Sequence, residues 1–268
     1  MGQDCKTFQK QVLGHFRKEG RDLPWRHNIN PYRIWVSEIM LQQTQVPRVI
    51  EKYKAFLRVF PSFRKLAQAP LKEVFGTWQG LGYNRRALAM SKTAKIVVTE
   101  YRGRLPCTVD ELIALPGIGH ATACAILAYA YNYPCTFIET NIRSVYLHHF
   151  FHTRKNVSDQ ELLPLVEKTL DHNNSRVWYW ALMDYGSWLK TQIDNPNKKS
   201  KHYTRQSRFK GSHRQVRGAV LKMLGSSSGT VNSIQKEIKF PITRVRKALI
   251  ELRHEGFVKL RGNFFYIA

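Results

Sequence analysis

Apolar residues recur at steps of three and four along most of the first 190 residues, which is the spacing of amphipathic helices. The run Val49, Tyr53, Phe56, Leu57 and Phe60 is one example. Proline and glycine interrupt the pattern, as at Pro61, Pro70, Gly80–Gly82, Pro116–Gly117 and Pro134. The pattern predicts eight to ten helices of moderate length between Phe8 and Leu189, and almost no sheet.

The pattern changes after residue 190. The segment 194–202 is polar, basic and contains Pro196, and is typical of a linker or a DNA-facing loop. Three short helices are then predicted over 214–224, 230–238 and 242–254, with Thr230 as a cap. Residues 258–267 alternate around a Gly-Asn turn, which indicates a hairpin. We therefore expect a mainly α chain with one domain at 1–204 and a winged helix–turn–helix at 205–268.

Charge limits the class of partner. The 268 residues include 43 Lys and Arg against 19 Asp and Glu, a formal net charge of +24. Solubility alone needs far less charge, so a polyanion, most simply duplex DNA, is the expected partner. The alternative for the C-terminal module is a small packing unit with a solvated basic face. No long apolar run or signal peptide is evident, so we expect a cytoplasmic, DNA-associated protein without membrane contact.

The four cysteines, Cys5, Cys107, Cys124 and Cys135, contain no C-x-x-C pair. This spacing favours free thiols in a reducing compartment over a structural zinc. The group His148, His149 and His152 has no cysteine or carboxylate at ligand spacing, so surface or core histidines are the better interpretation. The sequence therefore predicts no metal and no cofactor.

Glu38 stands among the apolar residues of Trp35–Val46, followed by the side-chain amides of Gln42 and Gln43. Apolar walls raise the proton affinity of a carboxyl group, so Glu38 is a candidate proton donor near neutral pH. The alternative is a partly exposed helix glutamate that pairs with an arginine or caps a backbone group.

A second motif lies at Leu115–Leu127, where Gly117 and Gly119 separate two helices. Glycine permits positive φ and keeps side chains out of the way of an approaching ligand. The amides of Ile118, Gly119 and His120 would then face outward at a helix N-terminus, where a phosphate is favoured. Such a hairpin, with Pro116 and Gly117 in its turn, would hold the DNA backbone without reading sequence.

Together these segments resemble the helix–hairpin–helix DNA glycosylase superfamily, and most closely the MutY-type adenine glycosylases. The resemblance runs from about residue 5 to about residue 190. It is carried by the segments Arg21–Arg26, Pro31–Tyr32, Ser37–Val46, Gly80–Tyr83, the hairpin and Glu139–Val145. It implies two helical subdomains with a cleft between them, one at about 31–134 and the other formed by the N-terminal segment with about 135–204.

The resemblance also implies a mechanism. The enzyme would flip a base from the duplex, with Gln43 and Tyr83 wedged into the gap. Glu38 would protonate the leaving purine, and Glu139 would stabilise the sugar cation, with Asn141 near the sugar. Further implied DNA contacts are Thr44, Arg143, Lys198, Lys199 and Lys201, and implied base-pocket residues are Arg21, Leu23, Trp25, Arg26 and Trp180.

The chain departs from the family pattern at several positions. Lytic members carry a lysine where this chain has Ala121, so no lyase activity is expected. The second carboxylate is Glu139 instead of Asp, and because Glu caps helices poorly, Thr140 is expected to cap the following helix. The four-cysteine iron–sulfur loop and the C-terminal 8-oxoguanine-recognition domain are absent from the sequence. Trp180 occupies the place of a residue that helps read adenine.

The predicted function is a monomeric, monofunctional glycosylase of base excision repair, removing adenine from A:G or A:8-oxoguanine mispairs. Two alternatives stay open. The same scaffold could remove thymine or uracil opposite G, or a damaged base. The chain could also be a non-catalytic binder of duplex DNA, in which the two carboxylates only pack.

Overall fold

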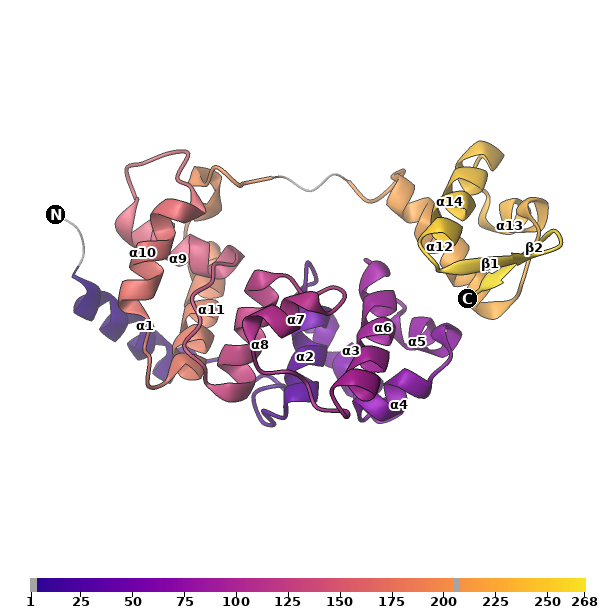
Figure 1. Ribbon diagram of the computed structural model, residues 1–268. Helices are drawn as coiled ribbons and strands as arrows, with labels where there is room; N and C mark the ends of the chain where they lie inside the picture. The colour runs from indigo at the N-terminus through magenta and orange to yellow at the C-terminus, as the bar shows by residue number, and fades with distance from the viewer. Residues whose placement is uncertain (1–3, 205–207) are drawn as a thin grey trace. The chain divides into compact units, whose positions relative to one another are not determined.

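A computed structural model describes residues 4–204 and 208–268 as a mainly helical chain (Figure 1). Between Cys5 and Gln192 it contains eleven α-helices, one more than the upper limit predicted. The elements are α1 (Cys5–Glu19), α2 (Pro31–Leu41), α3 (Val46–Val59), α4 (Phe63–Gln68), α5 (Leu71–Trp78), α6 (Arg85–Glu100), α7 (Val109–Ala114), α8 (His120–Tyr131), α9 (Thr140–Phe150), α10 (Asp159–Thr169), α11 (Ser175–Gln192), the 3-10 helix η1 (Pro196–Lys199), α12 (His213–Ser226), α13 (Val231–Ile238), α14 (Ile242–His254), β1 (Val258–Arg261) and β2 (Phe264–Ile267).

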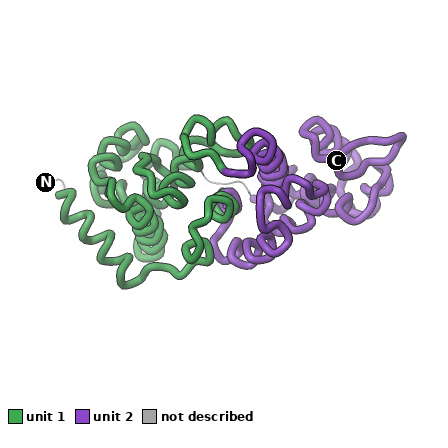
Figure 2. Tube along the Cα trace, turned by 60° about the horizontal axis from the view of Figure 1, so that its bottom comes forward, with its two compact units in different colours: residues 1–38, 105–205 green, residues 39–104, 206–268 purple. Residues whose placement is uncertain are grey.

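The chain divides into two compact units, coloured separately in Figure 2. Unit 1 comprises residues 1–38 and 105–205, and unit 2 comprises 39–104 and 206–268. The predicted subdomain at 31–134 includes residues of both units, since residues 31–38 and helices α7 and α8 fall in unit 1. Helix α8 buries all residues from Ala123 to Ala130. The predicted domain boundary at 204/205 adjoins residues outside the described ranges.

Unit 1 is built around the contact of α9 with α11. Gly186 of α11 lies against the start of α9, where a Cβ atom would come within 2.4 Å of the Asn141 carbonyl oxygen. Only glycine allows the two backbones to approach this closely. Phe8 and Val12 of α1 complete the same apolar core. The close crossing fixes where α9 begins.

The expectation of four free thiols is wrong, because the structure joins Cys124 and Cys135 in a disulfide. Cys124 lies on α8 and Cys135 on the extended segment after it, with Cα atoms 5.3 Å apart, which is within bonding range. The two residues are eleven apart in sequence and meet only because the chain turns back after Tyr131. Cys5 and Cys107 are free. The cysteines therefore no longer support a reducing compartment.

The C-terminal segments form the predicted elements. The Thr230 hydroxyl caps α13 by accepting from the Ser233 amide, and β1 pairs antiparallel with β2 on either side of Gly262–Asn263. Within unit 2 these elements pack on α5 and α6. The rings of Phe75 and Phe257 stack with centroids 5.4 Å apart. Arg85 donates to both carboxylate oxygens of Glu255, from Nη2 at 2.7 Å and from Nε at 3.0 Å.

Candidate active site

Glu38 lies in the last turns of α2, where its helical neighbours are almost completely buried. Trp35, Val36 and Ile39 are at most 1% exposed, whereas Glu38 itself is half-buried. Burial, with a smaller contribution from the charge of Glu139, raises the pKa of Glu38 to about 8. The apolar environment expected from the sequence is therefore present, and the carboxyl group is protonated at neutral pH.

Glu139 is the N-cap of α9, which corrects the expectation that Thr140 would take this role. Its backbone is extended, with φ −127° and ψ 179°, and its carboxylate folds back to accept from the amides of Asn141 and Ile142 at 2.5 and 3.0 Å. The longer side chain of glutamate reaches these amides because Glu139 itself stays outside the helix. Both amides donate to Oε1, and among the described residues no donor to Oε2 is recorded.

The pKa of both carboxyl groups is raised above the ordinary value by burial, but at Glu139 other contacts oppose this shift. Burial raises the pKa of Glu139, but the amides of Ile142 and Asn141 and the charges of Lys190 and Arg143 lower it. Glu38 has no such opposing contribution recorded among the described residues. We therefore expect Glu38 to hold a proton more tightly than Glu139. Two carboxyl groups with separated proton affinities can divide the roles of acid and electrostatic stabiliser.

Two stacked aromatic side chains, Tyr129 and Trp180, belong to the same region as the two carboxyl groups. Tyr129 is buried, and the pKa of its hydroxyl is raised by burial and by the charges of Glu38 and Glu139. Its ring stacks with that of Trp180, with centroids 6.2 Å apart. The guanidinium of Arg26 lies 5.3 Å from the Trp180 ring centroid. The sequence placed Trp180 and Arg26 together, but gave no indication of Tyr129, which resembles an ordinary core residue of α8.

A buried aspartate fixes the segment that precedes α2. Asp184 is 2% exposed and pairs with both Arg21 and Arg26, with nitrogen–oxygen distances of 2.7 Å. The two arginines, predicted to line a base pocket, are thus held in place by a charge that sequence analysis did not single out. The other predicted pocket residues, Leu23 and Trp25, are each 5% exposed and belong to the core.

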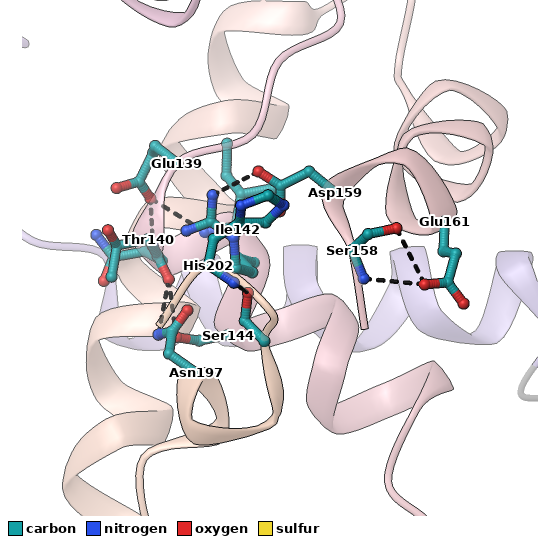
Figure 3. A network of polar contacts seen from close by, with 12 residues as sticks. Glu139, Thr140, Ile142, Ser144, Ser158, Asp159, Glu161, Asn197 and His202 are labelled. Atoms are coloured by element: carbon teal, nitrogen blue, oxygen red, sulfur yellow. Dashed lines mark hydrogen bonds and ion pairs between the residues drawn. The ribbon is translucent and has the colours of Figure 1, made fainter. Parts of the chain in front are cut away.

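The basic segment 194–202 is folded against α9 (Figure 3). Asn197 of η1 donates from Nδ2 to the Thr140 carbonyl at 3.1 Å and to the Ser144 hydroxyl at 2.5 Å. Further along, Val157 bonds to Lys199 and Lys201 through backbone groups. The segment is therefore a part of unit 1 that supports the first turn of α9, rather than a free linker.

Several predicted DNA contacts have partners within the protein. Arg143 forms an ion pair with Asp159 through two hydrogen bonds, each of 2.7 Å. Lys198 binds Asp194, and Lys199 donates to the His152 carbonyl. Lys201 is exposed. The role of these side chains at DNA stays a prediction.

The hairpin between α7 and α8 has the predicted form, with one difference. Gly117 has φ +81°, and Gly119 is the N-cap of α8 with an ordinary negative φ. The Ile118 amide donates to the Leu115 carbonyl at 3.3 Å, so it does not face outward as expected. The amides of Gly119 and His120, at the start of α8, remain as the candidate phosphate site.

In unit 2, Gln43 and Tyr83 both have left-handed backbones, with φ of +54° and +46°. Gln43 is exposed, Tyr83 half-buried, and the Tyr83 hydroxyl accepts from Arg214 of α12 at 3.3 Å. The Thr44 hydroxyl accepts from Arg86 at 2.9 Å. Arg86 is another residue that sequence analysis missed, since four of its six acceptors lie more than 40 positions away.

No group of three or more metal-ligating side chains occurs in residues 4–204 and 208–268. Within the same ranges, no helix combines the length and apolar character that a membrane span requires.

Comparison with known proteins gives consistent results. Residues 36–168 match the HhH-GPD superfamily of base excision DNA repair proteins. The adenine DNA glycosylase of Mycolicibacterium smegmatis is 31% identical over 93% of this chain and 92% of its own length. That of Buchnera aphidicola from Baizongia pistaciae is 37% identical over 68% of this chain but 53% of its own length. The chain thus spans about half the length of several of the relatives it matches.

Among solved structures, a thermostable thymine-DNA glycosylase superposes with a TM-score of 0.61 and 25% identity, over 68% of this chain and 86% of that one. The helical fold, the hairpin between α7 and α8 and the family match over residues 36–168 all indicate the same superfamily. The chain belongs to the HhH-GPD superfamily of base excision DNA repair proteins. Within that superfamily, the curated relatives described above are adenine DNA glycosylases.

Proposed function

We propose that this chain is a monofunctional adenine DNA glycosylase that removes adenine from A:G or A:8-oxoguanine mispairs. The observation that carries the proposal is the pair of carboxyl groups in unit 1: Glu38 stands among buried apolar residues of α2, which raise its pKa to about 8, and Glu139 accepts two amide hydrogen bonds at the start of α9. A neutral carboxyl group can donate a proton to a leaving ring near pH 7, which an ordinary glutamate cannot. The adenine specificity is taken from the relatives named above.

The reaction has four steps: protonation of the base, cleavage of its bond to the sugar, addition of water and return of the proton. Glu38 gives its proton to a ring nitrogen of the flipped adenine, and the bond between adenine and the sugar breaks with its electrons moving to the base. The sugar cation is stabilised by the carboxylate of Glu139, whose Oε2 carries no recorded protein donor among the described residues. Water then adds to the sugar, and its proton returns to Glu38. An abasic site and free adenine are the products.

The absence of lyase chemistry rests on Ala121, in the first turn of α8. A Schiff-base mechanism needs an amine nucleophile at the reacting sugar, and alanine has none. The charge of Lys190, like that of Arg143, acts on Glu139, and burial lowers the pKa of Lys190. Trapping with borohydride tests whether that lysine reacts, and we expect no covalent adduct with DNA.

We propose further that the C-terminal module binds duplex DNA as a winged helix–turn–helix. Arg246, Ile250 and Arg253 recur on one face of α14, and all three are exposed. Lys259 and Arg261 of the hairpin are also exposed. A helix with a basic outer face beside a basic hairpin suits contact with phosphates.

The substrate is tested with duplexes that each contain one defined mispair, followed by alkaline cleavage of abasic sites. Release of adenine opposite G or 8-oxoguanine is expected. Trp180 can stack on a base but cannot accept a hydrogen bond, and the thymine-DNA glycosylase shares this fold, so T:G and U:G duplexes belong in the panel. Activity on those alone would reject adenine as substrate.

The DNA-binding role of the module has a separate test. Replacing Arg246 and Arg253 by alanine should weaken binding to any duplex and reduce the salt slope of log K by about two, one for each phosphate that is no longer neutralised. A double variant with wild-type affinity and salt slope would show that this face of α14 does not contact DNA.

A further inference from the structure

Two loops of unit 2 carry unusual backbone conformations. Gln43, after α2, and Tyr83, before α6, both have φ near +50°, a region that side-chain-bearing residues rarely adopt. Such conformations persist only where surrounding contacts impose them, and they cluster at functional sites. Both residues are expected from the sequence to enter the gap that a flipped base leaves in the duplex.

One side chain binds both loops. The two terminal nitrogens of the Arg86 guanidinium, on α6, contact six acceptors at 2.5–3.2 Å, so that some of their four hydrogens are shared between acceptors. Nη1 reaches the carbonyls of Ile39, Met40 and Gln42, and Nη2 reaches the Thr44 hydroxyl and the carbonyls of Leu81 and Gly82. Four of these acceptors flank or precede Gln43, and two directly precede Tyr83.

The site suits arginine and no other residue. Ile39 and Met40 lie in the last turn of α2, where backbone carbonyls lack helical partners and a cation is favoured. The guanidinium is planar and lies 5.1 and 5.5 Å from the ring centroids of Trp78 and Tyr83, so it contacts the Tyr83 ring as well as the backbone that precedes Tyr83. Arg86 is 7% exposed, which makes loss of its bonds costly. Burial lowers the pKa of Arg86 to about 10, and it stays charged at neutral pH.

We propose that Arg86 is a positioning residue that joins the Gln43 loop and the Tyr83 loop into one rigid wedge, which unstacks the target base. This rests on the proposed glycosylase function. Arg86 itself does not touch DNA or the reacting atoms; its role is to hold two strained loops in the conformation that enters the duplex. The flipping step should therefore depend on Arg86, whereas bond cleavage on a base that is already unpaired should depend on it much less.

The test compares the wild-type chain with Arg86→Lys, which keeps the charge but lacks the planar fork of donors. Lys92→Ala is the matched control, because Lys92 is an exposed cation on the same helix. Flipping is followed by the fluorescence of 2-aminopurine placed beside adenine in an A:G duplex. Cleavage is followed by single-turnover adenine release from that duplex and from one with adenine opposite an abasic site.

Arg86→Lys should reduce the fluorescence rise by about half or more and slow release from the A:G duplex about tenfold, since the cost of unstacking is no longer offset. Release opposite the abasic site should slow by about threefold or less, because no partner base has to be unpaired. Lys92→Ala should behave as the wild type on both duplexes. A folded Arg86→Lys with the full fluorescence rise, or with equal slowing on both duplexes, overturns the inference.

Thr44→Val covers the case in which Arg86→Lys does not fold. It removes one acceptor of Arg86 and leaves the guanidinium in place. It should show the same pattern with a smaller effect, and a normal fluorescence rise in this variant counts against the proposal. Should the wild type give the fluorescence rise without adenine release from any duplex, the glycosylase function fails while the wedge inference stands.

Discussion

We expect Glu38 to make the protein less stable at alkaline pH, and Glu38→Gln to remove this effect. The pKa of the carboxyl group is raised from its ordinary 4.5 to about 8 in the folded chain. Between these two values the folded state binds a proton that the unfolded state has lost, so the free energy of unfolding falls as pH rises. Above pH 8 both states are ionised, and the full cost of burying the charge is present.

The size of the effect follows from the same two values. Each pH unit between them corresponds to about 1.4 kcal/mol, so the upper limit is about 5 kcal/mol. Glu38 is half-buried and its charged form can draw in water, which reduces the expected cost to about 1–3 kcal/mol. Glutamine has the same shape and no charge. Glu38→Gln should therefore match the wild type at pH 5 and exceed its stability by this amount at pH 9.

Denaturant unfolding at pH 5, 7 and 9 measures the difference directly. The net charge of +24 makes the stability of both proteins depend on pH, but these contributions cancel when variant and wild type are compared. Glu51→Gln, at an exposed position of α3, serves as the control and should show a constant difference. A Glu38→Gln difference that stays constant or shrinks from pH 5 to pH 9 would refute the placement of Glu38 in an apolar environment.

Three further outcomes are expected. Gly186→Ala should destabilise the chain by about 1–3 kcal/mol, because the new Cβ would lie 2.4 Å from the Asn141 carbonyl oxygen. Gly14→Ala is the control: its Cβ would meet nothing within 4 Å, so it should stabilise the chain by about 0.5–1 kcal/mol. Equal denaturation midpoints for the two variants would contradict this. Asp184→Asn should cost about 3 kcal/mol, since it leaves Arg26 buried without a full negative partner, and a loss below about 1 kcal/mol would show that the pair is dispensable. Borohydride treatment during base release should leave no protein bound covalently to DNA, and a strong adduct would reveal an amine nucleophile.

The parts of the fold that were predicted correctly depend on interactions between residues close together in the sequence. The hydroxyl of Thr230, the alternation over 258–267 and the Pro-Gly turn before α8 each act within a few residues, so their outcome did not depend on the rest of the chain. The environment of Glu38 was predicted for the same reason, because its apolar walls are its own helical neighbours.

Long-range contacts explain what the sequence did not predict. Asp184 meets Arg26 across 158 positions, and Arg86 meets Ile39 across 47. Nothing in the local pattern of either segment marks such a partner. The capping role of Glu139 was missed for a different reason: a general preference against glutamate at this position was outweighed by the extended backbone that precedes α9.

The central claim is that Glu38 donates a proton to the leaving base, and single-turnover release of adenine from an A:G duplex tests it most directly. For the wild type, the rate should fall about tenfold per pH unit above pH 8, as the acid form is lost. Glu38→Gln should bind the same duplex with similar affinity and release adenine at least about a hundredfold more slowly. Undiminished release by Glu38→Gln would contradict the account.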